Sequence, residues 1–124
     1  MSLYSPYKGK KGVKRIINAF YYSITGLIIA YQHEAAFRQI ILMNLILVPL
    51  SFFIKVTSIE RALMIAVYLL AIVIELFNSA LEAVVDRISL ERHILSKNAK
   101  DMGSAAQLIA IFIILSTWLI ILSH

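Results

Sequence analysis

Three acidic side chains and one carboxamide share a face of a predicted helix in the second half of the chain. Counting from Glu75, Asn78 lies three residues on, Glu82 seven and Asp86 eleven. At 3.6 residues per turn, this spacing places all four on one stripe. Carboxylates in such a stripe are suited to accepting a proton or to binding Mg²⁺. The stripe is therefore the first candidate for chemistry in this sequence.

The stripe closes an apolar run that has the character of a membrane helix. If that helix enters the bilayer near Glu60, a span of about 20 residues ends near Ala80. Glu75 then lies about 8 Å inside the cytoplasmic boundary. Because an ionisable group is costly at that depth, its presence indicates a function.

Composition identifies the class of protein that must position these groups. The chain has 124 residues, of which 60% are hydrophobic, and its mean hydropathy is +0.83. These values indicate a small integral membrane protein with a single domain, 1–124. The absence of cysteine excludes a disulfide framework, and three scattered histidines argue against a zinc site. The net charge of +5 is better explained by membrane topology and anionic lipid than by nucleic acid.

Hydrophobic periodicity predicts an all-α fold. The polar, basic segment 1–12 lacks the apolar core of a signal peptide and is expected to be a flexible cytosolic tail. Apolar residues then recur at three- and four-residue intervals, which predicts an amphipathic surface helix over 13–32. Three apolar runs are expected to form transmembrane helices over 34–54, 60–85 and 99–122, with a kink at Pro49 in the first.

Basic residues predict the orientation in the membrane. Most of them lie in the N-terminal segment and in the connector 86–98, whereas Lys55 and Arg61 are the basic residues of the opposite side. By the positive-inside rule, the N-terminus and the connector are cytosolic and the C-terminus faces outward.

Several further polar residues have both an ordinary and a functional interpretation. Lys14 is explained by solvation beside anionic lipid, whereas Arg15 and Tyr22 are stronger candidates because they share a stripe with Asn18. Glu34 opens a helix, where a carboxylate is favoured by the helix dipole. Lys100 and Asp101 lie at the membrane surface, where charges are ordinary but a phosphate-binding lysine is also expected. The small residues Ala99, Gly103, Ala106 and Ala110 form a stripe that helix packing explains.

The soluble nucleotide-binding and hydrolase motifs are absent from the sequence. Carboxylates for Mg²⁺, cations for phosphate and an acid near the headgroup level fit phosphoryl transfer to a lipid alcohol. Intramembrane acids also serve transporters and proton relays, so a small transporter or proton channel stays open. A purely structural membrane protein is the third alternative.

Three segments of the sequence resemble the prokaryotic diacylglycerol kinase family. They are Glu34 to Gln39, the stripe from Glu75 to Arg87, and Leu95-Ser96 followed by Ala99 to Ala106. The resemblance implies a homotrimer of three-span subunits in the bacterial inner membrane that makes phosphatidic acid from diacylglycerol and MgATP. The diacylglycerol branch is matched more closely than the branch that phosphorylates undecaprenol, which is kept as the alternative.

The resemblance also implies roles for individual residues. Glu75 would be the general base, with Asn78 beside it, and Glu34 and Glu82 would hold the metal ion and the ATP phosphates. The other residues expected to bind ATP are Arg15, Tyr22, Glu91, Arg92, His93, Lys100 and Asp101. The positions expected to face the lipid, besides Glu75, are Ser23, Arg38, Gln39, Arg61 and Ser104.

Overall fold

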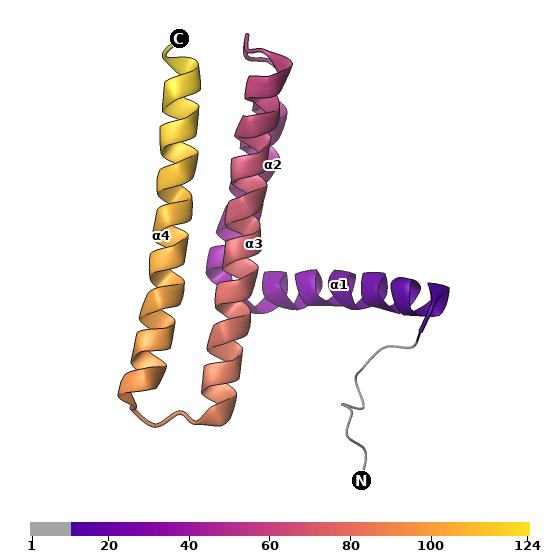
Figure 1. Cartoon of the computed structure of the whole chain (residues 1–124), viewed down its shortest axis with the longest axis vertical. Helices are drawn as coiled ribbons and strands as arrows, with labels where there is room; N and C mark the ends of the chain where they lie inside the picture. The colour runs from indigo at the N-terminus through magenta and orange to yellow at the C-terminus, as the bar shows by residue number, and fades with distance from the viewer. Residues whose placement is uncertain (1–10) are drawn as a thin grey trace.

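The computed structural model describes residues 11–124, which form four helices and no strand. The helices are α1 (Val13–His33), α2 (Ala35–Ser51), α3 (Ser58–Ile88) and α4 (Ile94–Leu122). Helix α3 packs against both α2 and α4, while α1 extends away from this bundle (Figure 1). The all-α prediction is confirmed for this part of the chain. Most of the predicted tail 1–12 lies outside the described residues.

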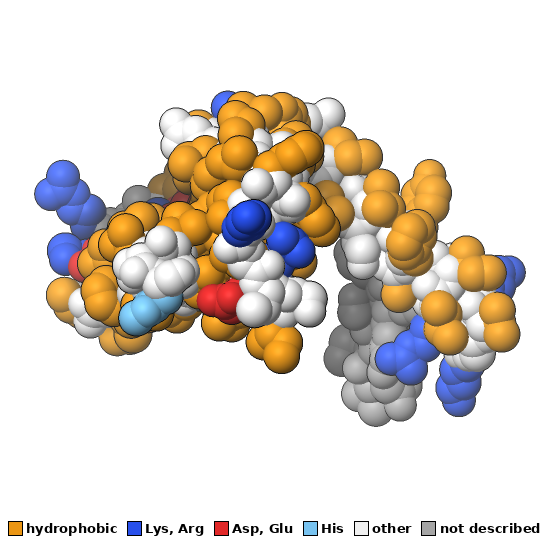
Figure 2. Space-filling model, turned by 90° about the horizontal axis from the view of Figure 1, so that it is seen from above, with side chains coloured by type: hydrophobic (Ala, Val, Ile, Leu, Met, Phe, Trp, Pro, Cys, Tyr) orange, Lys and Arg blue, Asp and Glu red, His pale blue; other side chains and the backbone are white. Residues whose placement is uncertain are grey.

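Two of the helices, α3 and α4, are each long and apolar enough to cross a membrane. Helix α2 has 17 residues and is about 25 Å long, slightly less than a hydrocarbon core of about 30 Å. It qualifies only together with α1, from which it is bent by 108°. Viewed from the end where α4 terminates, hydrophobic side chains form most of the surface (Figure 2). By length and apolar character, the described helices therefore provide two candidate membrane spans, or three if α1 and α2 together count as one span.

The sharp bend between α1 and α2 is held by a side chain of α2. Arg38 Nη1 donates hydrogen bonds to the carbonyl oxygens of Tyr31, at 2.8 Å, and Gln32, at 3.1 Å. These carbonyls belong to the last turn of α1, where no later helical N–H reaches them. We call the segment 30–38 the elbow. Its guanidinium contact ties the direction of α1 to that of α2.

The elbow packs against the middle of α3. Ala30, Phe37 and Ile72 form a buried cluster, and Leu76 packs against it. Glu75 lies between these two α3 residues in the sequence, so the elbow stands at the level of Glu75. Helix α1 leaves the bundle at this level, and the paired ends of α3 and α4 continue beyond it (Figure 1).

The turn between α2 and α3 is fastened by Arg61. Its Nε donates to the carbonyl of Ser51 at 2.9 Å and its Nη2 to that of Ile54 at 3.0 Å. The same guanidinium lies over the Phe52 ring, 5.5 Å from its centroid. Pro49 stands in the last turn of α2, where the helix ends two residues later. The Arg61 guanidinium thus binds carbonyls at the C-terminal end of α2, where Pro49 helps to terminate the helix.

Helix α3 begins with a reciprocal cap. The Thr57 hydroxyl accepts the Glu60 N–H at 3.1 Å, and the Glu60 carboxylate accepts the Thr57 N–H at 2.9 Å. Two N–H groups that would lack helical partners are satisfied in this way. The helix then continues to Ile88, three residues past the predicted span 60–85.

Helix α4 begins at Ile94, five residues before the predicted span 99–122. The reason is a cap that hydropathy does not reveal: His93 Nδ1 accepts the N–H of Leu95 at 3.1 Å. The non-helical connector is therefore 89–93 and not the whole of 86–98. Helix α4 packs along α3, where Gly103 lies against Asn78, Ala110 is buried and Trp118 Nε1 donates to the Met64 carbonyl at 3.2 Å.

Candidate functional site

Glu75 is buried inside the helical bundle, with only 5% of its surface exposed. It shares its side of α3 with buried residues one turn earlier, Ala71 and Ile72. A carboxylate at this position is partly shielded from water and lies level with the elbow. If α1 lies along the membrane surface, Glu75 stands at the depth of a lipid headgroup. The depth of Glu75 in a membrane stays a prediction.

Glu34 is not used as a helix cap. It occupies the N-cap position of α2, but its side chain makes no capping hydrogen bond. Together with Ser23 of α1 and Ser79 of α3, it lines a cavity of about 540 Å³ between the two helices. Glu82 follows Ser79 by less than one turn of α3. The fold thus leaves the Glu34 carboxylate without a capping bond, on a cavity whose α3 wall includes Ser79, three residues before Glu82.

A second cavity, of about 640 Å³, lies where α3 and α4 meet the connector. It gathers five of the residues predicted to bind ATP, and they come from the connector and the first turns of α4. Its polar lining residues are Asp86, Ser89, Glu91, Arg92, His93, Ser96, Lys97, Lys100 and Asp101. We call this cavity the connector pocket. Its cations could pair with phosphate groups.

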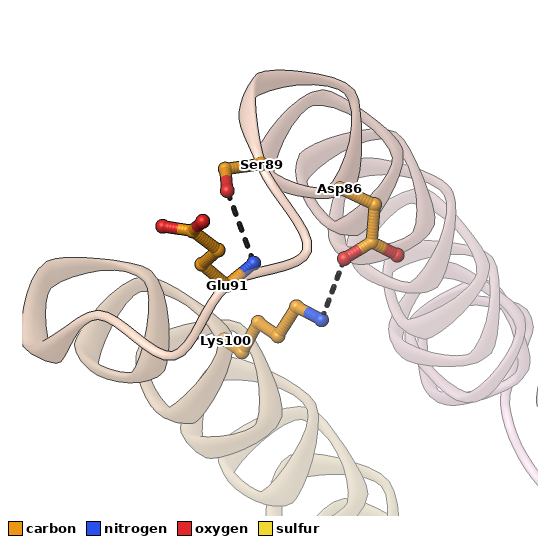
Figure 3. Close-up of polar contacts among 4 residues, drawn as sticks. All are labelled: Asp86, Ser89, Glu91 and Lys100. Atoms are coloured by element: carbon orange, nitrogen blue, oxygen red, sulfur yellow. Dashed lines mark hydrogen bonds and ion pairs between the residues drawn. The ribbon is translucent and has the colours of Figure 1, made fainter.

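Lys100 reaches across the connector pocket from α4 to α3. Its ammonium lies 2.8 Å from the Asp86 carboxylate (Figure 3). The Glu91 carboxylate points away from this pair, while its backbone N–H donates to the Ser89 hydroxyl at 3.0 Å. Because both charged side chains of the pair are about half exposed, an incoming phosphate can compete for Lys100 at modest cost.

Lys97 also belongs to the connector pocket, although the sequence did not suggest a role for it. It pairs with Asp101 at 2.6 Å on the exposed face of α4. A signal was present, since Lys97 and Lys100 are three residues apart and so lie on one helix face. His93 both caps α4 and lines the pocket, so its position is set by the fold.

Not every predicted site residue joins these two cavities. Arg15 and Tyr22 are exposed on α1. Arg61 lies 14 residues before Glu75, which is about 21 Å along α3, and it is engaged at the α2–α3 turn. Gln39 and Ser104 are exposed on α2 and α4. These residues stay predictions that a single chain does not bring to Glu75.

The donor set available for Mg²⁺ is small but chemically suitable. The described residues contain no group of three or more metal-binding side chains. Mg²⁺ at nucleotide sites is usually held by one or two carboxylates together with phosphates and water. Glu34, free of capping bonds, and Glu82 fit that pattern, and phosphates and water would complete the coordination of the ion.

The fold and these side chains define a helical membrane protein with a buried carboxylate level with the elbow and a charged pocket at the connector. That combination fits an enzyme acting on a membrane lipid as well as a transporter, and comparison with known proteins distinguishes the two. A family model described as prokaryotic diacylglycerol kinase matches residues 21–122. The chain belongs to this family of lipid kinases, which confirms the resemblance and identifies the chain as an enzyme.

Relatives from three organisms are similar over nearly their whole length. The chain is 60% identical to a diacylglycerol kinase of Pseudomonas aeruginosa over 118 residues, covering 95% of this chain and 96% of the relative. Identity to the diacylglycerol kinase of Escherichia coli K12 is 50%, covering 91% and 93%. For the diacylglycerol kinase of Helicobacter pylori 26695, identity is 42%, covering 87% and 84%.

Proposed function

We propose that this protein transfers the γ-phosphoryl group of ATP to the free hydroxyl of diacylglycerol, forming phosphatidic acid and ADP. The proposal is supported by near full-length similarity to diacylglycerol kinases and by one observation above all. A buried carboxylate, Glu75, stands at the level where α1 leaves the bundle, the depth expected for a lipid hydroxyl.

In the proposed reaction, Glu75 is the general base. Its carboxylate accepts the hydroxyl proton of the lipid as the oxygen forms a bond to the γ-phosphorus. The bond between that phosphorus and the β–γ bridging oxygen breaks, and ADP leaves with the bridging oxygen. Asn78, one turn further along α3, would orient the reacting groups.

The nucleotide is proposed to bind between the connector pocket and the α3 stripe. Asp86, in the pocket, and Glu75 are 11 residues apart, or about 16 Å along α3. Glu82 lies between them. A triphosphate bound lengthwise would contact Lys100 at one end and direct its terminal phosphate toward Glu75.

Mg²⁺ is proposed to be held by Glu34 and Glu82. Bound there, the ion would neutralise charge on the phosphates. The two carboxylates come from different helices, so their separation depends on the elbow. The Arg38 bonds to the α1 carbonyls therefore contribute to the metal site indirectly.

We further propose that three copies assemble in the bacterial inner membrane, with the N-terminus and the connector cytosolic. Arg15 and Tyr22, exposed on α1, would then contribute to a nucleotide site completed by a neighbouring copy. Lipid contact is proposed for Ser23, Gln39 and Ser104. A trimer would enclose both substrates, which three spans of one chain cannot do.

One assay tests the activity directly. Purified protein in mixed micelles is supplied with MgATP and a panel of lipid alcohols, and phosphorylated lipid is quantified. Diacylglycerol should give phosphatidic acid in equal amount to ADP. ADP without phosphorylated lipid, or solute transport by liposomes without ATP consumption, would refute the proposal.

A further inference from the structure

Gln107, near the middle of α4, has a carboxamide with no hydrogen bond. Both of its terminal atoms, Nε2 and Oε1, are buried, and neither has a partner among residues 11–124. Buried amide groups normally find partners, because an unpaired one loses its hydration without compensation. This side chain therefore requires a partner that the packing of the helices brings near.

Contacts between α3 and α4 identify the residue opposite Gln107. Trp118 of α4 donates to the Met64 carbonyl of α3. The two helices run in opposite directions. Counting 11 residues back along α4 from Trp118 leads to Gln107, and counting 11 residues forward along α3 from Met64 leads to Glu75. Eleven residues are close to three full turns, so Gln107 lies on the same face of α4 as Trp118, and Glu75 lies on the same face of α3 as Met64.

A further contact gives nearly the same register on the other side. Gly103, four residues before Gln107, lies against Asn78, three residues after Glu75. Beyond them, the long Lys100 side chain reaches Asp86 at 2.8 Å, about one helical turn out of this register. Gln107 is thus bracketed by contacts in both directions along the helix pair, and Glu75 is the α3 residue at its level.

We propose that Gln107 is a positioning residue whose Nε2 donates a hydrogen bond to the Glu75 carboxylate. The inference rests on the proposed role of Glu75 as the base. Packed helices lie 8–10 Å apart, and both side chains have three rotatable bonds, so rotation of the side chains is sufficient for them to meet. One carboxylate oxygen would then be fixed by Gln107, leaving the other for the lipid hydroxyl.

The chemistry of the pair suits this role. An amide stays uncharged, so it orients the carboxylate without adding a charge to the buried site. It donates the same N–H before and after the proton arrives. A base held in one orientation spends more of its time in reach of the hydroxyl, which raises kcat without strengthening substrate binding.

The test replaces Gln107 by leucine, which has similar volume and no hydrogen-bonding atoms. Gln107→Leu should lower kcat at least fivefold and leave the KM values for ATP and diacylglycerol within twofold. The matched control is Asn44→Leu, which removes another buried carboxamide with an unpaired oxygen, from α2. Asn44 lies seven residues beyond Phe37 of the elbow, about 10 Å along α2, so its variant should keep wild-type kcat.

A double-mutant cycle separates positioning from a structural effect. Glu75→Asp shortens the side chain by one methylene group and so withdraws the carboxylate from Gln107. Adding Gln107→Leu to Glu75→Asp should change kcat less than twofold. An equal loss of kcat in both backgrounds, or unchanged kcat with altered subunit assembly, would overturn the inference. If Glu75→Gln retained full turnover, the proposed base would fail instead, so the two failures are distinguishable.

Discussion

Gly103 of α4 packs directly against the carboxamide of Asn78 on α3. A Cβ atom at residue 103 would overlap Asn78 Oδ1, and it would lie 3.1 Å from Asn78 Cγ and 3.4 Å from Leu81 Cδ2. Asn78 Oδ1 is itself buried and unpaired within the described residues. The position of this proposed active-site amide therefore depends on the absence of a side chain on the neighbouring helix.

Gly103→Ala should displace Asn78 and push α4 from α3. Overpacking of this kind costs about 1–3 kcal/mol, so we expect a lower melting temperature in detergent and a kcat reduced about tenfold. Asn78→Ala combined with Gly103→Ala should be no less stable than Asn78→Ala alone, because the overlap is gone. Gly26→Ala is the control, since nothing lies within 4 Å of a Cβ at residue 26. Wild-type kcat and melting in Gly103→Ala would contradict the proposed importance of this contact.

Glu75→Gln should abolish most turnover while the protein still assembles. A carboxamide keeps the shape of the side chain but cannot accept the hydroxyl proton, so kcat should fall by about 10² or more. Nucleotide binding, measured by equilibrium dialysis, should stay close to wild type. Glu60→Gln, on the same helix at the Thr57 cap, should leave kcat unchanged. Near-normal turnover in Glu75→Gln would rule out the base.

The proposed metal ligands make a separate prediction. Glu34→Gln and Glu82→Gln should each raise the Mg²⁺ or MgATP concentration needed for half-maximal rate, because each removes one anionic oxygen donor. Titration of activity with Mg²⁺ at fixed ATP measures the shift, and removal of Mg²⁺ by chelation should stop the reaction. A variant that keeps the wild-type dependence on both Mg²⁺ and MgATP shows that its residue is not a ligand.

The sequence predicted the helices well because apolar periodicity determines them. Glu75 and Glu82 could be selected as candidates because a carboxylate in an apolar helix is conspicuous at any register. In contrast, the partners of Arg38 and Arg61 depend on the bends at the two ends of α2, which hydropathy does not encode. The early start of α4 depends on a histidine cap, a local geometry with no apolar signal. The position of Gln107 opposite Glu75 could be inferred only from the way α4 packs against α3.

Membrane topology is testable with single cysteines, because the chain contains none of its own. Cysteine at Lys10 or at Ser96 should react with an impermeant thiol reagent only from the cytosolic side, and cysteine at Ser123 only from the outside. Ser96 is the most informative position, since it lies in the connector pocket. Labelling of a cysteine at Ser96 from the outside would contradict the predicted membrane topology.

The last prediction concerns the choice of lipid. Diacylglycerol and undecaprenol both present a hydroxyl near the interface, so Glu75 and the metal carboxylates cannot discriminate between them. Diacylglycerol also carries two ester carbonyls that accept hydrogen bonds, whereas a polyprenol offers only an apolar chain. A donor left unpaired by the wrong lipid costs about 1–3 kcal/mol. We therefore expect at least a tenfold preference in kcat/KM for diacylglycerol, or about 1.4 kcal/mol.

The structure identifies which donors to change in that experiment. The Arg38 guanidinium already binds two carbonyls of the elbow, so Arg38→Ala should reduce turnover of both lipids by loosening α1. Gln39 and Ser104 are exposed and free to meet a lipid, so Gln39→Ala and Ser104→Ala should narrow the preference while sparing undecaprenol turnover. Competition assays with both lipids in one micelle give the ratio directly. Equal or faster turnover of undecaprenol by the unmodified protein would refute the assignment, since the ester carbonyls would then contribute nothing to recognition.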